Sequence, residues 1–304
     1  MDQNASLIAL DWGTTSFRAY LFDTSGACME RVSAKAGIMQ VQGGRFEETL
    51  HDHVGAWLSK FPGVPIIASG MITSNQGWVE TPYLESPASM ADLSANLVRH
   101  TTGDGRLIHF VPGVCQHGPT ANVMRGEETQ MAGIQDKNPR LAILPGTHSK
   151  WIFMENEVIP KFWTFMTGEI FAALTQHTIL GRLITEGEDR ESFEAGVRQG
   201  FSSEEGAGIL SKLFGARAMP VLGTMESDSI GDYISGLLLG TEIQEALGSG
   251  AAREAKPLII GENDLARRYA RALSICGYEP ELSEVDFAAR GLYRIACEAK
   301  LGAL

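Results

Sequence analysis

Residues 7–23, LIALDWGTTSFRAYLFD, contain an apolar run that ends at Asp11, a short turn of Gly and Thr, and a second apolar run. Apolar runs joined by a short turn are typical of neighbouring antiparallel strands, which we expect at residues 6–11 and 17–22. A third run at 27–33 follows an Asp-Thr-Ser-Gly turn and extends this pattern. The N-terminal part therefore predicts a three-stranded meander with a Gly-Thr turn between its first two strands.

The same arrangement occurs again at residues 141–157, LAILPGTHSKWIFMENE. When Gly13 is aligned with Gly146, both turns follow one apolar run and precede another. Each copy is followed by segments that predict helix, strand and helix. The chain therefore contains a faint internal duplication, in which Asp11 of the first copy is matched by Leu144 of the second.

The whole pattern predicts an α/β protein of two domains that divide near residues 136–140, DKNPR. We expect these domains at 1–135 and 136–304, with the last helix able to pack back on the first domain. The expected helices are 46–61, 90–100, 125–134, 167–180, 205–214, 230–247, 262–276 and 287–301, and the expected strands outside the first meander are 65–69, 107–111, 257–260 and a second meander over 141–165.

Composition excludes several classes of partner. The formal net charge of −12 argues against binding to nucleic acid, which requires clustered Lys and Arg. The N-terminus is polar, and no apolar run approaches the roughly 20 residues of a membrane span. The four cysteines are scattered, as expected of free thiols in a reducing cytosol. We therefore expect a cytoplasmic protein that binds neither nucleic acid nor membrane, and a homodimer stays an open alternative.

The two Gly-Thr turns have the composition of phosphate-binding turns, because backbone N–H groups and hydroxyls converge there and glycine lets the chain approach a ligand closely. The residues expected to bind phosphate are Gly13, Thr14 and Thr15 in the first turn, and Gly146, Thr147, His148, Ser149 and Lys150 at the second. For Lys150, contact with the acceptor is an alternative. Asp11, at the end of the first strand, is placed to hold Mg²⁺ through its carboxylate.

Two stretches resemble the phosphate motifs of the superfamily of actin-like ATPases and sugar kinases, namely LDWGTTSFRAYLFD and LPGTHSKW. Others, spread over almost the whole chain, resemble the narrower family of the 2-dehydro-3-deoxygalactonokinases: SGMITSNQGW, VMRGEETQMAG, FWTFMTGEIF, YISGLLLGTEI and ARGLYRIA. This resemblance implies two ribonuclease-H-like domains with ATP and substrate in the cleft between them. It also implies ATP- and Mg²⁺-dependent phosphorylation of the terminal C6 hydroxyl of 2-dehydro-3-deoxy-D-galactonate, in galactonate catabolism.

The resemblance further implies a catalytic carboxylate in the stretch GEET, residues 126–129. Related sugar kinases carry an Asp there, whereas this chain offers Glu127 and Glu128. The glycerol-kinase pattern favours Glu127 and the hexokinase pattern favours Glu128; we favour Glu127 slightly and keep both. The alternative is that both are acidic residues of a first helical turn, where the helix dipole stabilises negative charge.

Substrate recognition is expected from the long loop at 69–87 and from two arginines. The loop combines polar side chains with aromatic ones, of which we favour Ser74 and Trp78 for sugar-acid binding. The guanidinium of Arg125 suits a substrate carboxylate. Arg18 resembles an arginine of glycerol-type kinases, and a structural ion pair is its alternative role.

The stretch LIIGENDLARRYARAL, residues 258–273, resembles the adenosine motif of the superfamily, of which only Gly261 is retained. Two other functions stay open. One is a kinase of this fold that acts on another sugar or sugar acid, such as 2-keto-3-deoxygluconate. The other is an actin-like nucleotide switch without an acceptor, against which the GEET stretch and the aromatic-polar loop argue.

Overall fold

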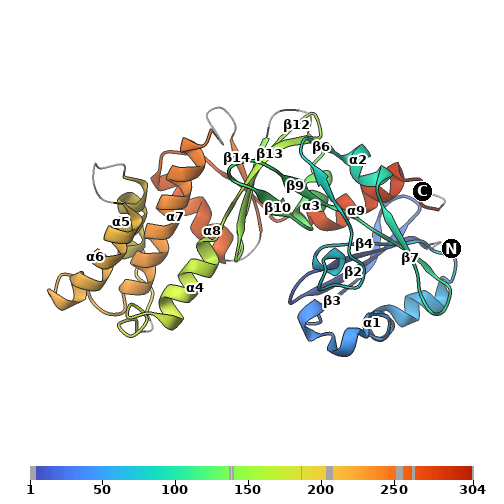
Figure 1. The fold of residues 1–304 in the computed structure, drawn as a ribbon, viewed down its shortest axis with the longest axis horizontal. Coiled ribbons are helices and arrows are strands. Elements are labelled where there is room, and N and C mark those ends of the chain that lie inside the picture. Colours follow the sequence, from blue (N-terminus) through green and yellow to red (C-terminus); the bar gives the residue numbers. More distant parts are fainter. Residues whose placement is uncertain are drawn as a thin grey trace. The chain divides into compact units, whose positions relative to one another are not determined.

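The computed structural model describes residues 5–136, 138, 140–185, 187–202, 208–250, 256–261 and 264–302 (Figure 1). The chain forms two compact units. Unit 1 comprises Met1–Asn138, Met154–Lys161 and Asp286–Leu304, and unit 2 comprises Pro139–Phe153 and Phe162–Val285. These units differ from a simple division at 136–140, of which residues 137 and 139 lie outside the described part, because two later segments of the chain belong to unit 1.

Unit 1 contains a six-stranded sheet. Its strands in spatial order are β3 (Cys28–Ala34), β2 (Phe17–Asp23), β1 (Ala5–Trp12), β4 (Ile66–Ser69), β8 (Leu107–Phe110) and β7 (Val98–Thr101). The first three are antiparallel, which confirms the predicted N-terminal meander, whereas β4 runs parallel to β1 and β8 parallel to β4. The carboxyl ends of β1 and β4 therefore meet at one edge of the sheet.

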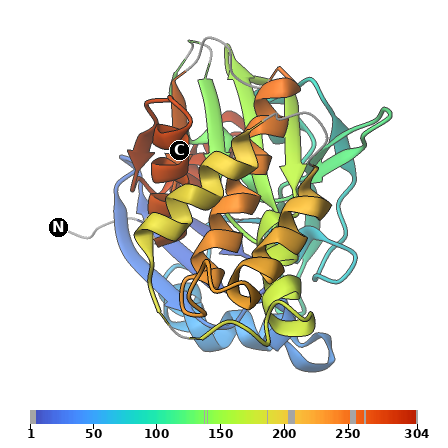
Figure 2. The ribbon, with the colours of Figure 1, turned by 90° about the vertical axis from the view of Figure 1, so that its left-hand side faces the viewer.

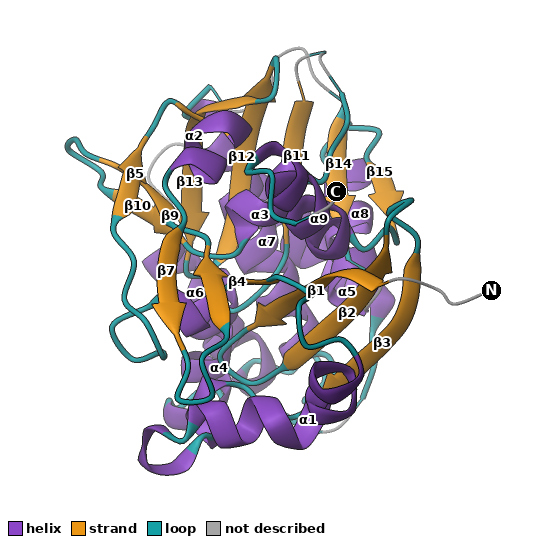
Figure 3. Ribbon diagram, turned by 90° about the vertical axis from the view of Figure 1, so that its right-hand side faces the viewer, coloured by secondary structure: helices purple, strands orange, loops and turns teal. Residues whose placement is uncertain are grey.

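Helices cover both faces of this sheet, as Figure 3 shows. On one face lies α1 (Phe46–Lys60), whose apolar side chains share a core with alternate residues of β1. On the other face lie α3 (Glu127–Ala132) and α9 (Phe287–Glu298). Since the added Cβ of an alanine at Gly291 would come within 1.7 Å of the Thr129 carbonyl oxygen, α3 and α9 are in backbone contact. This contact joins the last helix to unit 1.

The remaining elements described between residues 38 and 124 of unit 1 are short. They are η1 (Ile38–Gln40), η2 (Gln42–Gly44), η3 (Met71–Thr73), β5 (Tyr83–Glu85), β6 (Ala88–Ser89), α2 (Met90–Ala95), β9 (Gly113–Gln116) and β10 (Asn122–Met124). The expected helix at 90–100 was wrong beyond residue 95. Asn96 ends α2, with its side-chain amide donating to the Asp92 carbonyl oxygen, and the next residues pair with β8 as strand β7.

The second sheet repeats the order of the first. Its strands in spatial order are β15 (Glu281–Ser283), β14 (Pro257–Ile260), β11 (Arg140–Leu144), β12 (Ser149–Glu155), β13 (Val158–Phe165) and β6. The order β13-β12-β11-β14-β15 matches β3-β2-β1-β4-β8, and β14 is parallel to β11 as β4 is to β1. The predicted internal duplication is therefore confirmed at the level of topology.

Five helices lie in the described part of unit 2, and α5 and α7 pack side by side (Figure 2). Their bounds are α4 (Thr167–His177), α5 (Arg190–Phe201), α6 (Ile209–Val221), α7 (Ile230–Gly248) and α8 (Asp264–Ile275). The helix α5 was not predicted from the sequence. The next helix was expected at 205–214 and α8 at 262–276, of which residues 205–207, 262 and 263 lie outside the described part.

Two further findings concern expectations drawn from composition. No helix within the described ranges is both long and apolar enough to cross a membrane. Cys28, Cys115, Cys276 and Cys297 are all free thiols.

Candidate active site

Polar side chains gather where β1, β2 and β4 of unit 1 meet. Asp11 of β1 is paired with Ser69 of the parallel strand β4 and with Arg18 of the antiparallel strand β2. Because paired residues of neighbouring strands point to the same face, all three side chains project toward the side of α3. Arg18 Nη1 lies 3.0 Å from Asp11 Oδ2. The predicted ion-pair alternative for Arg18 is therefore realised in this structure.

Glycines bring the start of α3 against the ends of these strands. Gly70, which follows β4, has a φ of 95°, and a Cβ there would lie 2.9 Å from the Trp12 carbonyl oxygen. Gly126, just before α3, has a φ of 111°, and its Cβ would lie 3.2 Å from the Gly70 Cα. Left-handed backbone and close approach both favour glycine. The GEET stretch is thereby held beside the end of β1.

Charged groups of both signs surround Asp11, with Arg18 paired to Asp11 itself and Arg31 paired to Asp286 at 3.3 Å. Burial raises the pKa of the Asp11 carboxyl, the neighbouring Arg18 guanidinium opposes this rise, and the carboxylates of Asp286 and Glu127 add to it. Asp286 also accepts a hydrogen bond from the Tyr20 hydroxyl at 2.8 Å. Three carboxylates therefore influence one small region of unit 1, which is an environment that favours a bound cation.

The two glutamates of GEET occupy different environments. Glu128 is fully buried, and both of its carboxylate oxygens lie 2.8 Å from the Gly126 N–H. Burial, with repulsion from Glu127, raises the pKa of Glu128 to about 7. Glu127 is only half-buried, accepts a hydrogen bond from the Arg125 N–H at 2.9 Å and acts electrostatically on Asp11. Of the two, Glu127 is therefore better placed to meet a ligand.

Glu128→Gln is expected to change the pH dependence of stability. A carboxyl group whose pKa is raised by folding keeps its proton longer in the folded state, so unfolding releases that proton between pH 4.5 and about 7. As the pH rises through this window, the wild-type free energy of unfolding should therefore fall, and this group contributes up to about 1.4 kcal/mol per pH unit to the fall. Denaturant titrations from pH 4.5 to 8 should show a shallower fall in the variant. An identical slope in both proteins would contradict a raised pKa for the buried Glu128 carboxyl.

The same region was tested for its fit to Mg²⁺, a hard cation that takes oxygen ligands and usually combines one or two carboxylates with waters and phosphates. Among the described residues, no cluster of His, Cys, Asp or Glu could hold a metal by protein ligands alone. Asp11 nevertheless offers a carboxylate, and the Oγ of Ser69 is buried without a hydrogen-bond partner among the described groups. An orphaned hydroxyl beside a carboxylate fits a hydrated cation.

Arg125 fastens the long loop to the start of α3. Its Nη1 donates to the Thr73 carbonyl and hydroxyl oxygens and to the Thr81 hydroxyl, each at 2.6 Å, and Nη2 donates to the Thr81 carbonyl oxygen. The guanidinium also lies 4.2 Å from the centre of the Tyr83 ring. This contact set differs from the predicted binding of a substrate carboxylate, which stays a prediction, since most of the guanidinium donors already have acceptors in the protein.

Ser74 and Trp78, the favoured loop residues, also have structural contacts. The Ser74 hydroxyl donates to the Met71 carbonyl oxygen at 2.7 Å and is largely buried. Trp78 stacks on Phe46 with an interplanar angle of 13° and packs edge-on against Trp12. Both side chains therefore shape the loop and attach it to the core of unit 1.

The first phosphate turn is exposed, and its backbone is in close contact with Gly37. Thr14 and Thr15 are exposed, and the Gly13 N–H donates to the Ser16 carbonyl oxygen at 2.9 Å. A Cβ on Gly37 would lie 2.3 Å from the Thr15 nitrogen, so the chain at 37 lies directly against the turn. The turn thus presents its two threonines outward from unit 1.

The second phosphate turn is only partly exposed. Thr147 and His148 are exposed, and His148 Nε2 is hydrogen-bonded to the carboxylate of Glu169 in α4. Ser149 and Lys150 are buried, and the Ser149 hydroxyl is hydrogen-bonded within the core of unit 2. The turn can therefore offer a ligand its backbone and its first residues, and the predicted phosphate contacts of Ser149 and Lys150 stay predictions.

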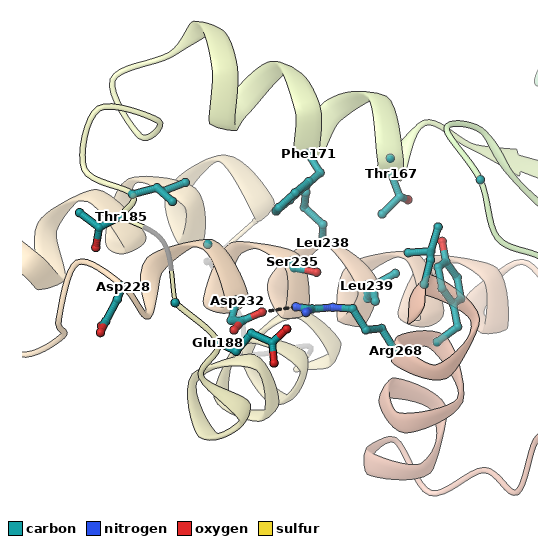
Figure 4. Close-up of a pocket in the computed structure, with 17 residues that line it drawn as sticks. Thr167, Phe171, Thr185, Glu188, Asp228, Asp232, Ser235, Leu238, Leu239 and Arg268 are labelled. Carbon is teal, nitrogen blue, oxygen red and sulfur yellow. Dashed lines mark hydrogen bonds and ion pairs between the residues drawn. The ribbon is translucent and has the colours of Figure 1, made fainter. Parts of the chain in front are cut away.

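A pocket of about 750 Å³ opens beside this turn within unit 2, which is a volume typical of small-molecule sites (Figure 4). It is lined by Gly146, Thr167, Gly168, Phe171, Ile184, Thr185, Gly187, Glu188, Asp228, Gly231, Asp232, Ser235, Leu238, Leu239, Leu265, Arg268 and Tyr269. Only Gly146 of these was predicted from the sequence. Gly261 is not among them, and its N–H donates to the Ser283 carbonyl oxygen at 3.2 Å.

The pocket has an apolar wall and a charged floor. Figure 4 shows the Phe171 ring, from α4, directed toward Leu238 of α7. The Arg268 guanidinium, from α8, reaches Asp232 of α7 in an ion pair, and Glu188 lies close by. Such a combination suits a ligand with a flat apolar part and several hydroxyl or amine groups.

The repeated five-strand order, with a Gly-Thr turn after the first strand of each copy, defines a protein of the actin-like ATPase and sugar-kinase superfamily. The same fold occurs in the activator of the 2-hydroxyisocaproyl-CoA dehydratase from Clostridium difficile, with a TM-score of 0.50 at 12% identity over 98% of this chain and 96% of that one.

Within this superfamily, the chain belongs to the 2-keto-3-deoxy-galactonokinase family, whose model matches residues 11–295. It is 34% identical over 276 residues to the 2-dehydro-3-deoxygalactonokinase of Escherichia coli (strain K12), covering 90% of this chain and 91% of that protein. It is 33% identical to a probable 2-dehydro-3-deoxygalactonokinase of Rhizobium meliloti (strain 1021), covering 96% of each chain. A crystal structure of a candidate 2-dehydro-3-deoxygalactonokinase from Sinorhizobium meliloti matches with a TM-score of 0.87 at 31% identity, over 95% of this chain and 98% of that one.

Proposed function

We propose that this protein transfers the γ-phosphoryl group of ATP to the C6 hydroxyl of 2-dehydro-3-deoxy-D-galactonate, giving ADP and 2-dehydro-3-deoxy-6-phospho-D-galactonate in the cytoplasm. Membership of the family over residues 11–295 supports the reaction. The observation that carries the assignment of chemistry to residues is the convergence of Asp11, Arg18 and Glu127 at one edge of the unit 1 sheet.

The acceptor side of the reaction belongs to unit 1. The half-buried Glu127 carboxylate accepts the proton of the C6 hydroxyl as the oxygen attacks phosphorus, and the bond between that phosphorus and the leaving ADP oxygen breaks. Arg18, whose side chain is 44% exposed, has donors left to bind the anionic sugar acid beside its ion pair with Asp11. The loop that Arg125 fastens would form the wall of this subsite.

The nucleotide side belongs to unit 2. The pocket beside Gly146 would hold the adenosine, with the base along Phe171 and Leu238 and the ribose near Glu188 and Asp232. The second turn would then lie next to the phosphates, to which it offers backbone N–H groups. Asp11, with Ser69 close by, would hold Mg²⁺, which neutralises charge that develops on the transferred phosphoryl group.

The proposal is tested by coupling ADP release to the acceptor. We expect ADP to form in equal amount with the 6-phosphorylated acid when 2-dehydro-3-deoxy-D-galactonate is added, and only slowly without it, because a water molecule lacks the contacts that orient the sugar hydroxyl. The control substrate is the C4 epimer, 2-keto-3-deoxygluconate. A higher kcat/KM with the epimer would make the epimer the preferred substrate. ADP release independent of any sugar acid would contradict the assignment as a sugar-acid kinase.

A further inference from the structure

A buried carboxylate lies behind the second phosphate turn of unit 2. Glu242, on α7, is only 2% exposed. Its Oε1 accepts a hydrogen bond from Trp151 Nε1 at 2.7 Å, and its Oε2 accepts hydrogen bonds from the hydroxyls of Tyr269 at 2.8 Å and Ser149 at 3.2 Å. Burying a charge is costly unless it is compensated in this way. Residues of β12, α7 and α8 thus meet at one side chain.

The partners of Glu242 belong to the turn and to the pocket. Ser149 belongs to the predicted phosphate-binding residues 146–150, and its hydroxyl lies 2.6 Å from that of Tyr269. Tyr269 lines the pocket, as does Thr167, whose side chain is also hydrogen-bonded to Glu242. The same carboxylate therefore holds both the turn and a wall of the proposed nucleotide pocket.

The hydrogen-bond donors around Glu242 need both of its carboxylate oxygens as acceptors. An ionised carboxylate only accepts hydrogen bonds and has about four lone-pair sites. The indole N–H of Trp151 and the hydroxyls of Ser149, Thr167 and Tyr269 are hydrogen-bonded to them, and the two protons of Ser149 and Tyr269 serve both Glu242 and the contact between these two hydroxyls. An amide in place of the carboxylate would turn an NH₂ group toward one of these donors, so at least one bond would be lost.

We propose that Glu242 is a positioning residue of the nucleotide site, which holds the second phosphate turn and the adjoining pocket wall in one arrangement. This inference rests on the proposed assignment of the pocket to the nucleotide. The role is indirect, because the hydroxyls of Thr167 and Tyr269, both residues that line the pocket, are hydrogen-bonded to Glu242.

The test compares Glu242→Gln with the wild type, and uses Glu245→Gln, an exposed residue of the same helix, as the matched control. Loss of one charge-assisted hydrogen bond is expected to weaken ADP binding about tenfold in calorimetry. The KM for ATP should rise by a similar factor, whereas the KM for the sugar acid should stay within about twofold, since the acceptor residues are in unit 1. The Trp151 indole N–H resonance should shift.

A shifted Trp151 resonance with unchanged ADP affinity would overturn the proposal, because Glu242 would then be a core residue only. If Glu242→Gln does not fold, Ser149→Ala tests the same link, since it frees the turn and leaves the other donors of Glu242 in place. Unchanged ADP affinity in that variant would equally overturn the proposal. When both variants fold, the double variant should bind ADP no more weakly than Glu242→Gln alone.

Failure of the underlying assignment has a different signature. Phe171→Ala removes an apolar side chain of the pocket and leaves the Glu242 network intact. If the wild type does not bind ADP, or if Phe171→Ala binds it as tightly as the wild type does, the pocket is not the nucleotide site. Weaker binding in Phe171→Ala together with unchanged binding in Glu242→Gln would remove only the positioning role.

Discussion

Replacing Glu127 by Gln is expected to lower kcat by about 10²–10⁴-fold, the usual contribution of general acid–base catalysis. The amide keeps the size of the side chain and cannot take the proton of the attacking hydroxyl. Substrate binding should change little, because Gln retains an oxygen that can accept hydrogen bonds. Steady-state kinetics of ADP formation, with both substrates varied, should therefore show the loss in kcat while both KM values stay within about threefold.

The neighbouring variant Glu128→Gln is the control for this result. Its side chain is fully buried and bonded to the Gly126 N–H, so its removal should act on folding and on the placement of α3. We expect Glu128→Gln to keep at least about a tenth of the wild-type kcat, in contrast to the loss expected of a catalytic group. A larger loss of kcat in Glu128→Gln than in Glu127→Gln would assign the base to Glu128.

The fold was largely predictable because strands and turns leave local signals. Alternation and short turns predicted the meander of β1–β3, and the Gly13 and Gly146 turns predicted the repeat that the strand order confirms. The misses have physical causes. Residues 98–101 form β7 because they pair antiparallel with the next strand, β8, and this pairing overrides the local helical pattern. The helix α5 was missed because its glycines at 196 and 200 lower the intrinsic helix propensity of the segment. In the structure these glycines allow close packing against α7.

The candidate site was less predictable, because a side chain's partners depend on chain segments far apart in sequence. Arg125 was expected to bind substrate, and the sequence did not show that its guanidinium would also have acceptors at Thr73 and Thr81. Ser149 belongs to a phosphate-like turn, yet its hydroxyl faces Glu242, 93 residues further on. The pocket beside Gly146 is lined by five separate segments, at 146, 167–171, 184–188, 228–239 and 265–269, whose convergence leaves no short pattern in the sequence.

Asp11→Asn is the second substitution with a large expected effect. Asn keeps the shape of the side chain and removes the charge proposed to hold Mg²⁺, so kcat should fall by about 10²–10³-fold, as for other groups that stabilise charge in a transition state. The Mg²⁺ concentration that gives half-maximal activity should rise at the same time. Kinetics at increasing Mg²⁺ measure both effects, and calorimetry of ADP with and without Mg²⁺ measures the metal's contribution without turnover.

The control is Asp52→Asn, an exposed aspartate of α1 in the same unit. It removes the same charge from the chain, so any general effect of net charge on metal or nucleotide binding would appear in both variants. Because Asp11 is crowded by Glu127 and Asp286, its neutralisation relieves repulsion while it also removes the ion pair with Arg18. These effects oppose each other, so the thermal stability of Asp11→Asn should stay near that of the wild type, and loss of activity with an unchanged Mg²⁺ dependence would show that Asp11 acts without the metal.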